Sequence, residues 1–158
     1  MNKRLISLTV NDSPGVLQRV AGLISRRGYN IESITVGASE TDGLSRMTVA
    51  AIGDEAVIRQ MCSQLRKLID VREARLLHER PFVSRELMLV KIRLDPARRA
   101  EIQSLTDTFR CSVVDVGPET AIVQAVGDPE KNDAFLQLIR PYGILEIART
   151  GETAMNRG

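Results

Sequence analysis

The sequence predicts an α+β fold in which two small units follow each other along the chain. Two observations lead to this prediction: strand-like and helix-like segments alternate in the order β-α-β-β-α-β, and after residue 84 the same order begins again. The length agrees, because 158 residues suffice for two units of about 75 residues, each with a small core. Each half therefore has the order of the ferredoxin-like motif.

In the first half, alternating apolar residues mark the strands, and apolar residues spaced three and four apart mark the helices. Strands are expected at residues 4–10, 30–38, 44–52 and 71–78, with the first helix at residues 15–27. Asp42-Gly43 indicates a hairpin between the second and third strands. Asp54 precedes the apolar stripe of a second helix, so its carboxylate is expected to cap that helix.

A connector at residues 79–84 is expected between the halves, because Pro81 cannot donate to a ladder and the alternation stops there. The first domain is therefore placed at residues 1–78 and the second at residues 85–158. The tail from residue 151 onward is polar and has no periodicity, so it is expected to be frayed.

The second half repeats the pattern of the first. Strands are expected at residues 85–93, 111–116, 120–127 and 143–149. Helices are expected to begin at Asp95-Pro96 and Asp128-Pro129, where the carboxylate can cap the helix and proline fits its first turn.

Composition excludes several classes of partner. The net charge is only +2 and the signs are mixed along the chain, so no face is expected to hold nucleic acid. RNA-recognition modules of this element order stack bases on aromatics, but the strand at residues 44–52 has none and the chain has no Trp. No apolar run approaches the roughly 20 residues of a membrane span, and the first residues alternate like a strand. A cytoplasmic protein without membrane or nucleic-acid partners is expected.

No constellation for covalent chemistry or metal binding stands out. His78, the single histidine, has no serine or cysteine nucleophile marked out for it. Cys62 and Cys111 lack the short spacing of a metal site and are expected to be reduced structural thiols. The sequence also has no phosphate-cradling glycine motif. We therefore expect no catalytic residue and no metal ligand.

The segment Asp12-Ser-Pro-Gly-Val-Leu17 predicts a strand end, a Pro-Gly turn and a helix start. The first N–H groups of a helix have no internal partner and lie at its positive end, so they can bind a small anion. Pro14 fits near the first helical position, and Gly15 keeps the approach clear of side chains. An amino acid carboxylate would fit there, with Asp12 or Asn30 left for its ammonium. The same residues also fit an ordinary helix cap, and both interpretations remain open.

Together with Gly28-Tyr-Asn-Ile-Glu-Ser33, this segment resembles the ACT domain, a small-molecule sensing module of amino acid metabolism. Further segments resemble the regulatory (small) subunit of acetolactate synthase, also called acetohydroxyacid synthase (AHAS). These segments are Leu44-Ser-Arg-Met-Thr48, Leu65-Arg-Lys-Leu-Ile-Asp-Val71, Arg85-Glu-Leu-Met-Leu-Val-Lys-Ile92, Phe109-Arg-Cys-Ser-Val-Val-Asp-Val116 and Ala134-Phe-Leu-Gln-Leu-Ile-Arg140. The resemblance covers nearly the whole chain.

The resemblance implies an ACT domain at residues 1–78, which binds effector and dimerises, and a small-subunit domain at residues 85–158. It implies a non-catalytic chain that binds no cofactor itself. Its partner, the large subunit, would carry thiamine diphosphate, magnesium and FAD and condense two 2-keto acids in branched-chain amino acid biosynthesis. The small subunit would raise that activity and confer feedback inhibition, usually by valine.

The resemblance also assigns an effector site. Its residues are Asp12, Gly15, Val16, Leu17, Asn30 and Ile31. The three at the helix start would offer backbone N–H groups to the valine carboxylate, and the two near residue 30 would close the site from a second copy of the chain. Asp12 stands where valine-sensitive members are expected to have Asn, and its carboxylate would attract the ammonium. A stand-alone ACT regulator of another enzyme or of transcription is the alternative, although no helix-turn-helix is evident.

Overall fold

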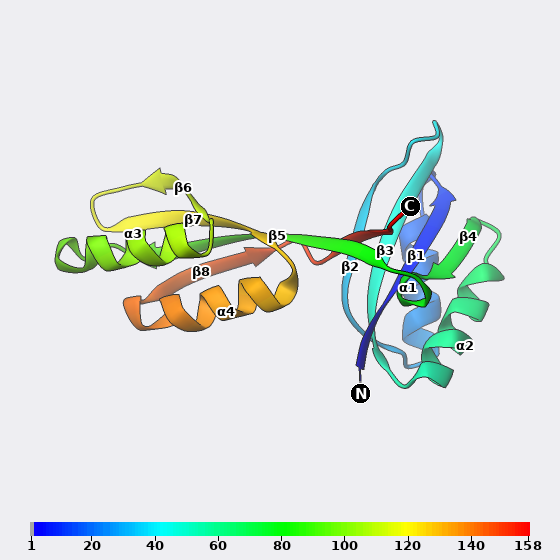
Figure 1. The fold of residues 1–158 in the computed structure, drawn as a ribbon. Helices are drawn as coiled ribbons and strands as arrows, with labels where there is room; N and C mark the ends of the chain where they lie inside the picture. Colours follow the sequence, from blue (N-terminus) through cyan, green and yellow to red (C-terminus); the bar gives the residue numbers. More distant parts are fainter. Residues whose placement is uncertain (1) are drawn as a thin grey trace. The chain divides into compact units, whose positions relative to one another are not determined.

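The computed structural model describes residues 2–158, which divide into two compact units (Figure 1). The first unit contains the chain up to Ser84 together with Gly151–Gly158, and the second contains Arg85–Thr150. Each unit has an antiparallel sheet with two α-helices on one face, in the expected β-α-β-β-α-β order. The predicted α+β class with two ferredoxin-like units is confirmed.

In the first unit the strands lie in the order β2-β3-β1-β4, and neighbours run antiparallel. The elements are β1 (Asn2–Asn11), α1 (Val16–Arg26), β2 (Asn30–Ala38), β3 (Leu44–Gly53), α2 (Glu55–Arg66), β4 (Val71–Leu76) and the 3₁₀ turn η1 (Leu77–Glu79). Between the sheet and the helices lies an aliphatic core that includes Ile6, Leu8, Val20, Ile58 and Leu65, all fully buried. Burial of each such side chain stabilises the fold by about 1.5–3 kcal/mol.

In the second unit the order is β6-β7-β5-β8. The elements are β5 (Phe82–Arg93), the 3₁₀ turn η2 (Pro96–Arg98), α3 (Arg99–Thr108), β6 (Ser112–Val116), β7 (Thr120–Gly127), α4 (Pro129–Ile139), the 3₁₀ turn η3 (Arg140–Tyr142) and β8 (Ile144–Arg149). Its core contains Met88, Val90 and Ile92 from β5. Phe135 meets Phe109 edge to face, with 5.5 Å between ring centroids.

Two of the three predicted aspartate caps lie at the start of an α-helix, and the third caps a 3₁₀ turn. Asp54 accepts a hydrogen bond from Val57 N at 2.9 Å at the start of α2. Asp128 accepts one from Lys131 N at 2.9 Å at the start of α4. Asp95 caps the short turn η2 rather than an α-helix, so α3 begins later than the sequence suggests. Each such cap is worth about 1 kcal/mol.

The boundary between the units differs from the prediction. The strand expected at residues 71–78 ends at Leu76, and residues 77–79 form η1. The expected connector at residues 79–84 is partly strand, because β5 already begins at Phe82. Pro81 precedes β5, so its missing donor removes no bond from this strand.

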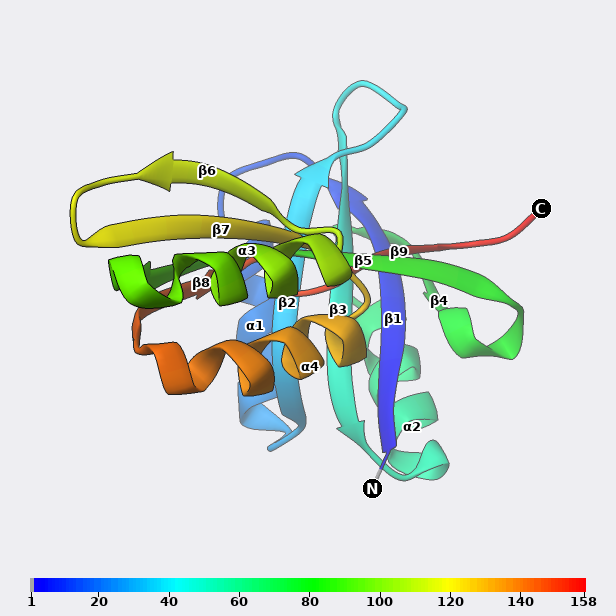
Figure 2. The ribbon, with the colours of Figure 1, turned by 60° about the vertical axis from the view of Figure 1, so that its left-hand side comes forward.

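The largest difference concerns the tail. Residues 151–158, assigned from the sequence to the second domain and expected to be frayed, pack in the first unit and contain strand β9 (Thr153–Asn156). β9 pairs with β5, and Figure 2 shows it running beside that strand. The sequence does not predict this packing, because Glu152 is buried through its ion pair with Lys3 and not as part of an apolar alternation.

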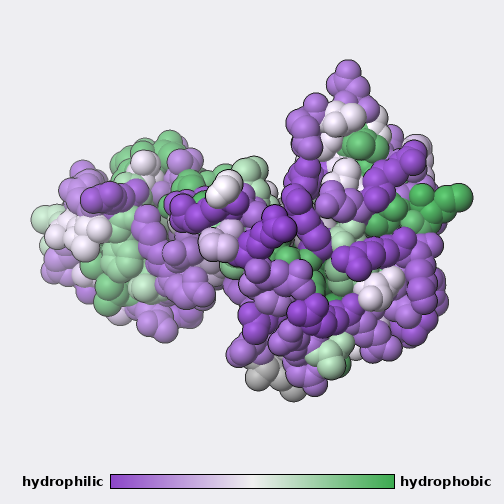
Figure 3. Space-filling model, turned by 45° about the vertical axis from the view of Figure 1, so that its right-hand side comes forward, coloured by the Kyte–Doolittle hydropathy of each residue, from purple (hydrophilic) through white to green (hydrophobic). Residues whose placement is uncertain are grey.

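The two sheets differ in the face turned away from the helices. In the first unit a second buried cluster covers part of this face, formed by Leu5, Ala50, Leu77 and Ala154 with the half-buried Phe82. In the second unit, apolar side chains of β5 and β7 remain exposed: Leu87, Leu89 and Val126. On the face drawn in Figure 3, green hydrophobic areas lie among purple hydrophilic ones.

Candidate functional site

The turn between β1 and α1 has the geometry of an open helix start. Gly15 immediately precedes α1 with φ +84°, in the left-handed region that favours glycine. The first helical bond runs from Arg19 N to Gly15 O at 3.0 Å, and no side chain caps the helix. The N–H groups of Leu17 and Gln18 consequently precede the first intrahelical donor and are open to an external acceptor.

The three residues assigned to this helix start have different environments. Val16 is buried in the core, and its N–H lies 3.4 Å from Ser13 O, a long hydrogen bond. Leu17 has 49% of its surface exposed. Gly15 forms the cap position rather than the first helical turn, which corrects the expected helix start at residue 15. Leu17 is thus the member best placed to offer its N–H to a ligand.

Arg19 adds a positive charge that sequence reasoning missed. A Cβ atom placed at Gly15 would lie only 2.8 Å from Arg19 Nη1, so the guanidinium lies against the helix start. Arg19 Nε donates to Asp70 Oδ2 at 2.5 Å, and the guanidinium holds the pKa of Asp70 below its usual value. The spacing of four residues from Gly15 could have indicated this neighbour, because such residues share a helix face. The start of α1 therefore offers an anion its free amides and the guanidinium donors of Arg19 that Asp70 does not use.

Asn30 and Ile31 lie at the opposite end of the same sheet. Asn30 is paired with Ile52, and Ile52 with Lys3 at the start of β1, whereas the Asp12 turn follows Asn11 at its end. Lys3 and Asn11 are eight positions apart on β1, which corresponds to about 27 Å of strand. Within one chain, the structure does not bring the two halves of the assigned site together.

Strand β2 lies at the edge of its sheet and, within residues 2–158, pairs with β3 alone. Its other edge presents the backbone groups that a further strand can use. Its last residue, Ala38, is paired with Ser45, which faces Val10 near the end of β1. If two copies of β2 paired antiparallel about a two-fold axis, Asn30 of one copy would reach the end of the sheet where the other copy has Gly15.

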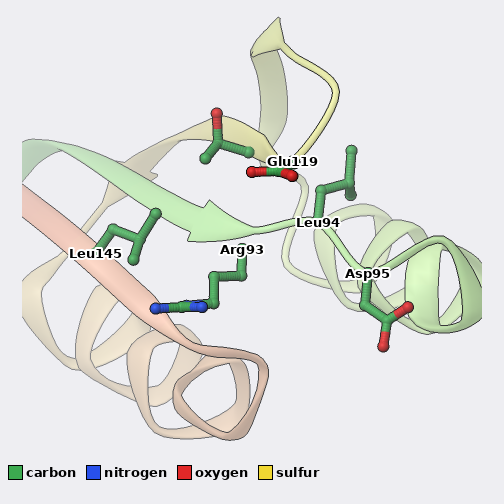
Figure 4. Close-up of a pocket in the computed structure, with 6 residues that line it drawn as sticks. Arg93, Leu94, Asp95, Glu119 and Leu145 are labelled. Atoms are coloured by element: carbon green, nitrogen blue, oxygen red, sulfur yellow. The ribbon is translucent and has the colours of Figure 1, made fainter.

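A hollow of about 570 Å³ lies in the second unit, lined by Arg93, Leu94, Asp95, Glu119, Thr120 and Leu145. Its charged groups are exposed, and the Arg93 guanidinium and Asp95 carboxylate point in different directions (Figure 4). Asp95 is already engaged as the cap of η2. The hollow therefore lacks the convergent polar groups of the α1 start.

Residues suited to covalent chemistry are isolated. Both ring nitrogens of His78 are buried without a hydrogen-bond partner, so no oriented nucleophile accompanies it. Cys62 and Cys111 are free thiols, and burial raises the pKa of each. Among residues 2–158, no three His, Cys, Asp or Glu side chains gather that could hold a metal ion. In the same described range, no helix is long and apolar enough to cross a membrane.

Comparison with known proteins accounts for both units. Residues 6–73 match the family model of the AHAS small subunit-like ACT domain, and residues 85–158 match that of the small subunit of acetolactate synthase. The chain is 54% identical over 155 residues to the probable acetolactate synthase small subunit of Methanothermobacter thermautotrophicus, covering 98% of this chain and 92% of that protein. Identity to the acetolactate synthase small subunit of Bacillus subtilis is 47% over 157 residues, covering 99% and 91%.

A solved structure agrees with these matches. The crystal structure of the acetolactate synthase small subunit from Thermotoga maritima superposes with a TM-score of 0.91 at 42% sequence identity. The match covers 100% of this chain and 99% of that one.

Proposed function

This chain belongs to the acetolactate synthase small-subunit family, and on that premise we propose that it binds the large catalytic subunit, raises its activity and makes it sensitive to valine. The observation that supports this most strongly is coverage: relatives named as small subunits match both units from end to end. A stand-alone ACT regulator would need only the first unit, and the second unit matches the small-subunit model as well.

In this proposal, the large subunit catalyses the reaction and this chain only regulates it. Thiamine diphosphate, magnesium and FAD would be held by the large subunit, which condenses the 2-keto acids. The side chains of His78, Cys62 and Cys111 are in keeping with this assignment, because neither ring nitrogen of His78 has a hydrogen-bond partner and burial raises the pKa of both thiols. Regulation would then act through binding equilibria between the two kinds of subunit.

For the effector we propose a site shared by two copies of the chain. The carboxylate of valine would be bound at the start of α1 by the N–H of Leu17, with the Arg19 guanidinium adding attraction. Asp12 is exposed beside this turn and would attract the ammonium. Asn30 and Ile31 would come from the partner copy, because about 27 Å of strand separates them from this turn within one chain.

Reconstitution with the cognate large subunit tests the proposal. The chain alone, supplied with thiamine diphosphate, magnesium and FAD, should form no acetolactate from pyruvate. Added to the large subunit, it should raise turnover, and valine should then inhibit the complex. Acetolactate formed by the isolated chain, or a large subunit that neither binds nor responds to it, would refute the proposal.

A further inference from the structure

The tail forms a strap that packs in the first unit. It contacts β2, the strand that carries Asn30 and Ile31, and continues directly from the last residue of the second unit. We define the strap as residues 151–156, which follow directly after Thr150, the last residue of the second unit. It packs within the first unit, on the sheet face away from the helices, where Ala154 is buried in the second cluster. The strap thus belongs to one unit by packing and continues the other by covalent connection.

Strand β2 is in direct contact with the strap. Thr35 Oγ1 donates a hydrogen bond to the backbone oxygen of Glu152 at 3.0 Å. Gly151 has φ +83°, and a Cβ atom there would lie 2.7 Å from Ser33 Cβ, so the strap approaches this strand as closely as glycine allows. These contacts begin two residues after Ile31, with a β-bulge between Ile31 and Ser33.

The buried Glu152 fixes the strap further. Only 4% of Glu152 is exposed, and its carboxylate lies 2.9 Å from Lys3 Nζ on β1. Lys3 Nζ also lies 3.4 Å from the Glu32 carboxylate on β2, beside the bulge. The ammonium thereby links the strap to β2 a second time.

On the other side of Gly151, the chain is hydrogen-bonded within the second unit. Thr150 N donates to Leu87 O at 3.0 Å, and Leu87 N donates to Thr150 Oγ1 at 3.1 Å. Arg149 donates through Nε and Nη2 to the buried Glu86 carboxylate at 2.9 and 2.6 Å, and through Nη1 to Asp133. The residues with these contacts and those of the strap are consecutive in the sequence: Arg149, Thr150, Gly151 and Glu152.

We infer that the strap couples strand β2 to the second unit, with Thr35 and Glu152 acting as positioning residues for the strand that carries Asn30 and Ile31. Movement at the start of β2 would change the Thr35 and Ser33 contacts and so be passed to Thr150 and β5. The role in inhibition rests on the proposed function, whereas the mechanical link itself does not. Coupling between two binding events is reciprocal. If effector binding at β2 alters the second unit through the strap, a partner that binds the second unit also alters the affinity for effector.

The test compares Thr35→Val, which keeps the shape but removes the donor, with Thr35→Ser, which keeps the hydroxyl. Thr41→Val, in the exposed β2–β3 loop, is the matched control, because its change also removes a hydroxyl but leaves the strap bond intact. Hydrogen exchange at the Leu87 and Thr150 amides is measured in the full-length chain. We expect it to be about fivefold faster in Thr35→Val, as for the loss of one hydrogen bond, and unchanged in the other two variants.

The second readout is inhibition of the reconstituted complex. With Thr35→Val, valine should bind the isolated chain with affinity within about twofold of the parent, since no ligand contact changes, while maximal inhibition at saturating valine falls. Thr35→Ser, which keeps the hydroxyl, should show the maximal inhibition of the parent. A general loss of stability at this position would not explain that difference between the two variants. Unchanged exchange at Leu87 and Thr150, or full inhibition in Thr35→Val, would overturn the inference. A parent chain that ignores valine would refute the proposed function, and the exchange result would still decide the mechanical link.

Discussion

The first helices of the two units begin in opposite ways. In the second unit, the 3₁₀ turn η2 leads into α3, and Asp95 caps this turn by accepting a hydrogen bond from Ala97 N at 3.0 Å. In the first unit, α1 follows a glycine without a side-chain cap, and the Arg19 guanidinium lies beside it. The turn before α3 thus has a carboxylate cap from the chain itself, whereas the start of α1 leaves amides that an external anion can use. The same element order therefore accommodates the proposed ligand site in one unit and a carboxylate cap in the other.

The two units also differ in how their sheets are covered. The strap and η1 cover part of the second face in the first unit, whereas Leu87, Leu89 and Val126 stay exposed in the second. A ferredoxin-like order alone leaves one sheet face open, so the additional strand β9 makes this difference. Regulation, on our account, uses the unit that has both the open helix start and the covered face.

Giving α1 a carboxylate like those that cap α2 and α4 should produce the largest effect. In Gly15→Asp, a like charge about 4 Å from the ligand carboxylate repels it by up to roughly 4 kcal/mol at an effective dielectric near 20. We expect valine affinity, measured by calorimetry, to fall by two to three orders of magnitude, while activation of the large subunit remains. Because Gly15 has φ +84°, unfolding should also become easier by about 1 kcal/mol.

Gly143→Asp is the matched control, because Gly143 has φ +93° and lies in the second unit. It should also destabilise the fold, but leave valine affinity unchanged. Equal losses of affinity in both variants would mean that backbone strain, rather than the charge at α1, disturbs binding.

Removing residues 151–158 should have the next largest effect. The first unit would lose the buried Ala154, the Lys3–Glu152 pair and the Asn156 side-chain bond to Leu77 O at 2.8 Å. We expect the free energy of unfolding in urea to fall by about 3 kcal/mol. A chain ending at Asn156 keeps these contacts and is the control. Equal stability of the two shortened chains would show that the tail does not stabilise the first unit.

Arg19→Gln tests the positive charge at the open helix start. Glutamine can still donate to Asp70, but removes the charge that lies beside Gly15. Valine affinity should fall about tenfold, the effect of losing one charge-assisted contact. Arg59→Gln removes an exposed arginine paired with Glu55 and Glu79, and should leave valine affinity unchanged. Parent-like affinity in Arg19→Gln would exclude Arg19 from the site.

The smallest expected effect is a pH dependence confined to the first unit, which contains the single histidine. Burial, and then the charge of Arg4, lower the pKa of His78, although Glu79 and Glu55 partly oppose this. The folded state thus favours the neutral ring. Its contribution to stability is complete above the ordinary pKa of about 6.5 and is lost as pH falls below it.

The check is denaturant unfolding of the parent and His78→Leu between pH 7.5 and 5. The parent should lose stability over this range by more than the variant does. Parallel curves for the two chains would show that His78 does not contribute.

The repeated element order and the aspartate caps were predictable, because both depend on local spacing and local hydrogen bonds. The strap was not, because Glu152 is buried through a partner 149 positions away in sequence, and no periodicity reports such a pair. Gly15 was recognised as important, but its left-handed backbone was not, since glycine fits either hand equally well. The 27 Å separation of Asn30 from the α1 start required the strand register.

The central claim is that each effector site combines the α1 start of one chain with the start of β2 from its partner. Calorimetric titration of valine into mixed dimers of Gly15→Asp and Asn30→Ala tests it directly, because a homodimer of either variant has both sites impaired. A mixed dimer should regain one site of normal affinity, built from the unaltered α1 of one chain and the unaltered Asn30 of the other. If each site belonged to a single chain, mixing would restore nothing, and that result would contradict the account.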